Sequence, residues 1–361
     1  MNPSHKQLIQ IALVALLLVG CVAVLLPFTG TLLFAIVICL TTLPIRNRLL
    51  TLCGGRSNLA ALLLSILLLL LLVVPMALLS GTLADGVQMG VRALKPLLET
   101  GVPPEPPQWI ADLPIVGPDI TRYWQDLADS REEMNNLLRQ VFDPTRKFAL
   151  AAVGLFAQGL LQLVLVIFFV FFIFRDTHIY ADALLTGSRM LGGDLGERML
   201  TLAEGTVTGV MAGIVGTAAA QALVAMLGFI IAGVPGVIAL TFATFFFSMV
   251  PVIGATLIWL GAAIWLYNGG QTGWAVFMVL WGMFGISSVD NFLKPILISR
   301  SASLPLLLIV VGVFGGVLVF GFIGIFLGPT LLALGQVLIR EWLAYAVPET
   351  PTAAAAVRET R

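Results

Sequence analysis

Long uncharged stretches dominate the chain, and short charged segments separate them. No Asp, Glu, Lys or Arg occurs between residues 205 and 289 or between residues 301 and 339. A membrane-spanning helix needs about 20 consecutive apolar residues, and both stretches are much longer than that. The pattern predicts an all-α, polytopic transmembrane protein with about eight membrane segments, some of which would be re-entrant helical hairpins.

The first half of the chain contains four predicted spans and two loops that carry arginines. The spans cover Leu8–Leu26, Phe28–Leu43, Leu59–Ser80 and Ala149–Phe174. The loop Pro44–Asn58 carries three arginines and no acid, and the loop Arg175–Glu204 carries three more arginines. Because cytoplasmic loops are enriched in Arg and Lys, we expect both loops and the N-terminus to be cytoplasmic.

The segment between residues 81 and 149 differs in kind from the rest of the chain. It holds 17 charged residues, ten acidic and seven basic. Apolar residues recur at helical spacing from Leu83 to Leu98 and again from Ile120 to Val141, with a proline-rich loop between the two runs. We predict an extracytoplasmic amphipathic helical insert that caps the membrane core or a neighbouring protomer. A solvated connector is the alternative.

The fifth predicted span begins with a face of small residues and runs to Ala232. Four glycines share this face: Gly205, Gly209, Gly213 and Gly216. Glycines at this spacing let two helix backbones approach closely inside a membrane. We therefore assign this face to helix packing.

Two pairs of apolar segments follow, each interrupted near its middle. In the first pair, Val237–Val250 and Ala255–Tyr267 meet at Pro251 and Gly254. Its arms would be about 21 Å long as helices, shorter than the ~30 Å hydrocarbon core of a bilayer. Such arms indicate a re-entrant hairpin, and two tilted spans are the alternative. Either arrangement returns the chain to the side from which it entered.

The second pair, Leu304–Phe320 and Phe322–Ile339, is interrupted at Gly321 and Gly324, and a further span, Trp274–Val289, lies between the pairs. Each pair crosses the membrane either twice or not at all, so neither pair changes the side on which the chain continues. The C-terminus is therefore expected in the cytoplasm.

The whole pattern divides the chain into five parts: 1–80 with three spans, 81–149 with the insert, 150–204 with the fourth span and a cytoplasmic loop, 205–347 as an apolar transport core, and 348–361 as a disordered cytoplasmic tail.

Three charged residues, Asp290, Lys294 and Arg300, stand between the two long uncharged stretches. Asp290 and Lys294 would share one helix face, and Pro295 would leave the carbonyl of Asn291 without its helical partner. Ionisable residues beside a broken helix are typical of ion and substrate sites in transporters. The simpler alternative is a cytoplasmic helix end, with Lys294 and Arg300 as anchors.

Composition excludes several classes of protein. Charged residues make up 11% of the chain and the net charge is zero, which argues against a nucleic-acid surface. No phosphate-binding G-x-x-x-x-G-K-[ST] motif occurs, and the two histidines and three cysteines form no metal-ligand pattern. We expect neither an enzyme nor a bound cofactor or metal. A transporter, a passive channel and a membrane scaffold remain.

The motifs of residues 251–329 resemble those of the autoinducer-2 exporter family of bacterial permeases. They are Pro251-Val252-Ile253-Gly254-Ala255, Asp290-Asn291 with Lys294-Pro295, Gly315-Gly316, Phe320-Gly321-Phe322-Ile323-Gly324 and Gly328-Pro329. The resemblance implies a homo-oligomeric transporter of the bacterial inner membrane, with a pentamer as the working expectation. Family members often carry Arg where this chain has Lys294, and Lys lacks the two-pronged geometry of Arg.

Three hypotheses follow for the function. The resemblance implies export of a small polar metabolite, with autoinducer-2 as the leading candidate. The alternatives are a sodium or lithium/proton antiporter that uses Asp290, and a scaffold that transports nothing. For a transporter, we expect the two interrupted pairs to meet in mid-membrane and form the substrate site from these residues: Pro251, Gly254, Asp290, Asn291, Lys294, Pro295, Gly321 and Gly324.

Overall fold

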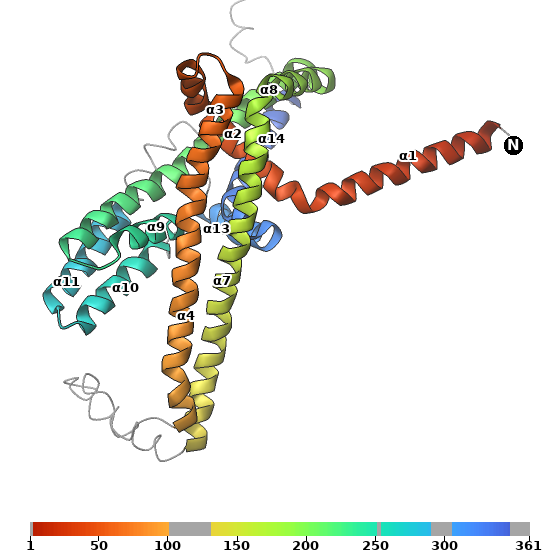
Figure 1. Ribbon diagram of the computed structural model, residues 1–361. Helices are drawn as coiled ribbons and strands as arrows, with labels where there is room; N and C mark the ends of the chain where they lie inside the picture. Colours follow the sequence, from red (N-terminus) through yellow and green to blue (C-terminus); the bar gives the residue numbers. More distant parts are fainter. Residues whose placement is uncertain (1–2, 101–130, 251–253, 290–304, 347–361) are drawn as a thin grey trace, which may run out of the picture. The chain divides into compact units, whose positions relative to one another are not determined.

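The computed structural model describes residues 3–100, 131–250, 254–289 and 305–346, and every element within them is helical. Six of these helices are long and apolar enough to cross a membrane: Ala12–Leu52, Ser57–Met89, Val153–Arg175, Thr177–Ile231, Thr272–Val289 and Leu307–Tyr345. The predicted all-α membrane fold is therefore confirmed (Figure 1). The exact number of membrane segments and the role of the insert remain predictions.

The first two helices meet at the predicted proline break. α1 covers Pro3–Leu25, a short 3-10 turn covers Leu26–Phe28, and α2 covers Thr29–Leu52. The expected loop Pro44–Asn58 was wrong over most of its length, because α2 continues through Pro44 to Leu52. Proline removes one helical hydrogen bond without ending the helix here, and only residues 53–56 form the turn into α3.

The next helices run without interruption through the boundaries we expected between spans and insert. α3 (Ser57–Leu68), a π-helical turn (Leu69–Val73) and α4 (Val74–Thr100) follow one another directly, and α7 covers Arg131–Arg175. Met76–Gln158 forms one compact unit, and residues 1–75 with 159–361 form the other. The start of the second amphipathic helix and the proline-rich loop lie outside the described residues.

α8 covers Thr177–Ile231, and its only non-helical backbone angles are at Gly193, with φ 54° and ψ −133°. The loop expected over Arg175–Glu204 is therefore helical almost throughout. Charged residues end before Gly205, so α8 consists of a charged segment and an uncharged one. The sequence pattern located the change in polarity correctly and allowed a short amphipathic helix over Met190–Glu204, but the helix extends over nearly the whole expected loop.

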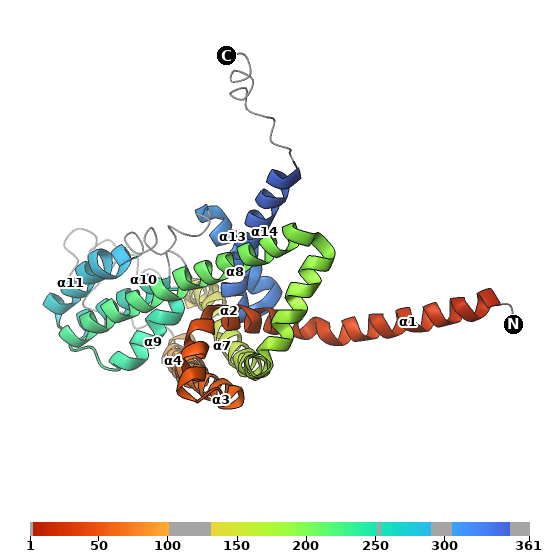
Figure 2. The same cartoon turned by 90° about the horizontal axis from the view of Figure 1, so that it is seen from above.

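Three shorter helices gather around the uncharged end of α8 (Figure 2). α9 covers Val237–Phe247, α10 covers Gly254–Asn268, and α11 covers Thr272–Leu280 and continues as a π-helical turn, Trp281–Ile286. Their shared core is apolar and rich in alanine: Ala225, Phe229, Ala232, Val234, Ala255, Trp259, Ala262, Ala263, Leu266, Ala275, Met278 and Ile286. The predicted break after Ala232 and the two short arms are present.

The last helices form a tight pair. α13 covers Leu306–Phe320, a 3-10 turn covers Gly321–Ile323, and α14 covers Gly324–Ala346. α13 packs along α14, and α14 also packs against α8 and α2. The predicted break at Gly321 is confirmed.

Candidate functional site

Glycines bring the backbones of α13 and α14 into direct contact. A Cβ atom added to Gly316 would overlap the carbonyl oxygen of Gly324, and one added to Gly328 would overlap the carbonyl oxygen of Gly312. Two glycines four residues apart on each helix therefore face two on the other, the pattern that permits close helix packing in membranes. The result is a helical hairpin whose two backbones touch at these four glycines.

The joint between these helices depends on Gly321 and on a side chain from α7. Gly321 has φ 67° and ψ −143°, a conformation open in practice only to glycine. The chain reverses there, and the carbonyl of Phe320 accepts a hydrogen bond of 3.1 Å from Nε2 of Gln162. Gly30 of α2 lies against the Phe320 ring, since a Cβ there would approach Cδ1 to 2.8 Å. Helices α2 and α7 thus hold the joint in place.

Aromatic side chains connect the joint to the first interrupted pair. The Phe322 ring, 2% exposed, lies 6.3 Å from the Phe246 ring near the end of α9 and 6.3 Å from the Phe326 ring of α14. Phe326 in turn lies 5.0 Å from Phe34 of α2. The end of the first arm and the second joint therefore share one buried aromatic cluster.

At the first joint, the described residues show how tightly the two arms pack. A Cβ on Gly254 would overlap the carbonyl oxygen of Phe247, so glycine is needed where α10 begins beside the end of α9. Pro251 lies outside the described residues, as do Asp290, Asn291, Lys294 and Pro295. Their convergence with Gly254 and Gly321 stays a prediction.

The helix that leads toward Asp290 is anchored to α8 by two hydrogen bonds. Nε1 of Trp281 donates to the carbonyl of Val224 at 2.9 Å, and Nε2 of Gln221 donates to the carbonyl of Ile286 at 3.4 Å. Gln221 is only 2% exposed. π-helical turns recur at functional sites, and these two bonds fix the turn Trp281–Ile286 against α8.

Two polar side-chain atoms near the joints are buried without a hydrogen-bond partner among the described residues. They are Oε1 of Gln162 and Oγ of Ser248, which directly follows α9. Buried oxygen atoms that accept no hydrogen bond destabilise a protein unless a ligand or water supplies a donor. They give this region the capacity to bind the hydroxyl groups of a polar solute.

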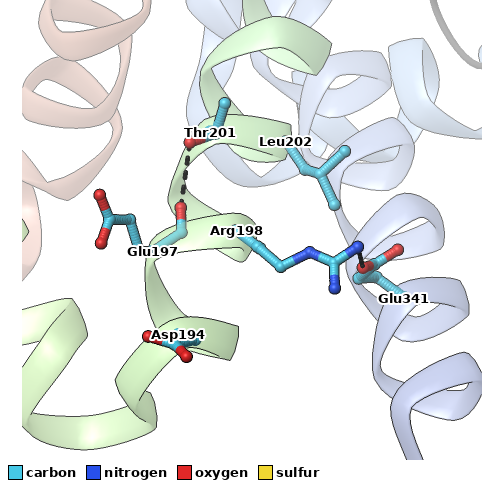
Figure 3. A pocket seen from close by; sticks show the side chains of 6 residues that line it. All are labelled: Asp194, Glu197, Arg198, Thr201, Leu202 and Glu341. Carbon is cyan, nitrogen blue, oxygen red and sulfur yellow. Dashed lines mark hydrogen bonds and ion pairs between the residues drawn. The ribbon is translucent and has the colours of Figure 1, made fainter.

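A charged cavity of about 540 Å³ lies away from the joints, between the first part of α8 and the end of α14 (Figure 3). Nη2 of Arg198 lies 3.6 Å from Oε1 of Glu341, and Arg189 makes a two-pronged ion pair with Glu197. The Arg189 guanidinium holds the pKa of the Glu197 carboxyl below its ordinary value. Of these ion pairs, only Arg198–Glu341 joins the first part of α8 to the end of α14, since Arg189 and Glu197 both belong to α8.

The four glycines assigned to packing on α8 differ in their environments. Gly213 is buried, and Gly209 and Gly216 are half-buried. Gly205 is exposed, and a Cβ added there would meet no described atom within 4 Å. Sequence reasoning did not single out Gly312, Gly316 or Gly328 as packing residues. Nor did it single out Gln162 as a residue of the joint, where its amide donates to the Phe320 carbonyl.

Among the described residues, no three His, Cys, Asp or Glu side chains lie close enough together to hold a metal ion. The region around the second joint offers glycine backbone, a glutamine amide, a serine hydroxyl and phenylalanine rings. These groups suit a small neutral solute with hydroxyl or carbonyl oxygens, because they supply hydrogen bonds and apolar surface without charge.

Comparison with known proteins shows the family. A family model described as "AI-2E family transporter" matches residues 11–344. The chain is 28% identical over 346 residues to "Putative transport protein YdiK" of Escherichia coli, which covers 95% of this chain and 92% of that protein. A relative from Buchnera aphidicola subsp. Schizaphis graminum with the same kind of name is 28% identical over 352 residues, with 95% and 94% covered. One from Aquifex aeolicus is 31% identical over 200 residues, 55% of each chain.

Proposed function

We propose, from the premise that this chain belongs to the AI-2E transporter family, that it is a secondary exporter of a small polar metabolite, with autoinducer-2 as the leading candidate. The family match covers nearly the whole chain, and the helices are those of a multi-pass membrane protein. The described residues hold no charged side chain between Gly205 and Val289. A neutral, oxygen-rich solute is the cargo that suits such a core best.

The observation that carries this proposal is the second joint. A helix is broken at Gly321, the amide nitrogen of Gln162 binds the carbonyl that ends α13, and the oxygen of the same amide is buried without a partner among the described residues. Irregular backbone at membrane depth is tolerated where it is buried in protein or lines a cavity, and transporters place their substrates at such breaks. The Phe246 ring lies near the Phe322 ring, so the end of α9 in the first interrupted pair belongs to the same aromatic cluster as the second joint.

We assign the substrate site to both joints together with the segment that follows α11. In this assignment Gly254, Gly321 and Gly324 let backbone groups approach the solute, and Pro251 leaves a carbonyl free. Asp290, Asn291, Lys294 and Pro295 supply the charged and polar contacts. The site lies in a bacterial inner membrane, with both termini cytoplasmic, and the working unit is a homo-oligomer for which we take the pentamer as the hypothesis to test.

Transport by the purified full-length protein in liposomes tests the proposal. Vesicles loaded with autoinducer-2 should release it faster than protein-free vesicles, and Asp290→Asn should abolish most of the difference while the protein still assembles. A deletion strain should retain more autoinducer-2 inside the cell. Equal release with and without protein, together with unchanged cellular levels, would show that autoinducer-2 is not the cargo.

A monovalent cation/proton antiporter is the second candidate, since Asp290 is the only acid between residues 205 and 339. A carboxyl in an apolar environment can exchange protons near neutral pH. Everted vesicles with a pH-sensitive dye distinguish the two: proton movement driven by sodium or lithium supports the antiporter. A scaffold that transports nothing predicts instead that Asp290→Asn and Lys294→Met leave every phenotype intact.

A further inference from the structure

Trp259 of α10 carries a buried hydrogen-bond donor that has no partner among the described residues. Its side chain is 6% exposed and lies in the apolar core shared by α8, α9, α10 and α11. The indole Nε1 is buried and makes no hydrogen bond there. An indole N–H can only donate, and leaving a buried donor unpaired costs free energy that a phenylalanine at this position would avoid.

The ring lies against a specially shaped part of the neighbouring helix. A Cβ on Gly282 would overlap the Trp259 ring, so glycine makes the room that the indole occupies. Gly282 belongs to the π-helical turn Trp281–Ile286, in which the Ser287 hydroxyl donates to the Gly282 carbonyl at 2.9 Å. Turns of this kind mark functional positions in many helices. Trp259 is five residues beyond Gly254, about 7.5 Å along α10 from the first joint.

A second tryptophan in the same bundle provides the contrast. Trp281 packs on Gly228 just as Trp259 packs on Gly282, but its Nε1 donates to the carbonyl of Val224 at 2.9 Å. The bundle thus contains one indole whose donor is used in the fold and one whose donor is not. Packing alone explains why an aromatic ring lies at position 259, but it does not explain why that ring carries an unpaired N–H donor.

We propose that the Trp259 indole N–H binds an oxygen acceptor of the transported solute, a hydroxyl, carbonyl or ring ether, within the α8–α11 bundle. The inference rests on the proposed function and narrows its substrate class. A donor without an acceptor function attracts an oxygen lone pair and offers nothing to a bare cation, which needs oxygen ligands. The indole N–H therefore selects an oxygen-rich metabolite, and this donor takes no part in binding sodium.

The test compares Trp259→Phe with Trp281→Phe in the full-length protein in nanodiscs, with autoinducer-2 and sodium chloride as probes. Trp259→Phe removes the unpaired donor together with part of the ring volume, and Trp281→Phe removes the same volume together with a donor that is paired. We expect Trp259→Phe to weaken autoinducer-2 binding about tenfold, or ~1.4 kcal/mol, and to lower the melting temperature of the free protein less than Trp281→Phe does. Trp281→Phe should retain autoinducer-2 affinity and lower that melting temperature.

A direct readout in the unmutated protein covers the case in which a variant fails to fold. The indole ¹H–¹⁵N resonance of Trp259 should move downfield with autoinducer-2 and stay in place with sodium. Equal affinity in Trp259→Phe, or a resonance that autoinducer-2 does not move, would overturn the inference. A resonance already at a hydrogen-bonded position and unmoved by the solute would indicate a resident water, and would overturn it too.

Liposome transport separates this inference from the proposed function. If the Trp259 resonance responds to autoinducer-2 but the solute is not transported, export of this cargo is wrong and the binding role of Trp259 stands. If transport occurs without a response, the binding role is wrong and export stands. If neither occurs, both are wrong.

Discussion

Single polar side chains hold helices of this protein to one another. Gln162, Gln221 and Trp281 each donate to a backbone carbonyl of another helix. Arg46, 4% exposed, donates at 3.2 Å to the carbonyl of Phe174, one residue before the end of α7. A cation is favourable at a helix C-terminus because the helix dipole is negative there. Several polar side chains in the apolar core thus join one helix to the backbone of another.

Replacing Gln162 by leucine should destabilise the second joint. The carbonyl of Phe320 would lose its hydrogen bond while it stays away from water, a loss of about 1–3 kcal/mol. Thermal unfolding in detergent should therefore shift to lower temperature. Gln158→Leu is the matched control, because this exposed glutamine lies one turn earlier on the same helix. Equal melting temperatures for the two variants would contradict the assigned role of Gln162.

At the scale of elements, direct backbone contact at four glycines holds the α13–α14 hairpin together. Gly312 and Gly316 on one helix meet Gly324 and Gly328 on the other. Because protein interiors are densely packed, a contact of this kind leaves no space for even one methyl group. We therefore regard the hairpin as a rigid support for the joint at its tip.

Gly316→Ala and Gly315→Ala distinguish close packing from a general preference for glycine. The added methyl group at Gly316 would overlap the Gly324 carbonyl and force the helices apart, at a cost of about 1–3 kcal/mol or more. The same group at Gly315 meets no described atom within 4 Å, and alanine there should stabilise the helix by about 0.5–1 kcal/mol. Melting temperatures that fall equally in both variants would argue against backbone contact.

At the scale of the molecule, hydrogen bonds and ion pairs place three polar segments on one side of the helices. The Ser57 hydroxyl donates to the carbonyl of Arg175 at 3.1 Å, so the α2–α3 turn and the end of α7 lie together. Arg198 and Glu341 join the first part of α8 to the end of α14. These are the segments that the distribution of arginines predicts to be cytoplasmic.

Cysteine labelling in whole cells tests this arrangement. In a background without Cys21, Cys39 and Cys53, cysteines at positions 56, 198 and 341 should resist a membrane-impermeant thiol reagent until the membrane is opened. A cysteine at position 269, in the turn between α10 and α11, should react at once from outside. The positions would have to be reassigned if 269 and 198 reacted from the same side.

Three kinds of information were present in the sequence alone. The length of the uncharged stretches sufficed for the all-helical membrane fold, because only apolar helices of that length satisfy their backbone within lipid. Gly321 revealed a break between helices, because glycine acts through its own backbone, whereas Pro44 lies inside α2 without ending it. The motifs of residues 251–329 were sufficient for the family.

Only the tertiary structure decided which residues meet. Helical spacing shows that Gly205 and Gly209 share a face, but it cannot show which neighbour covers that face. The close backbone contacts described lie instead at Gly316 and Gly324, eight residues apart and on opposite sides of a turn. Likewise, nothing in the spacing of Gln162 indicates that its partner is the carbonyl of Phe320. Such pairings depend on how separate helices stack in three dimensions, and local propensity carries no information about that.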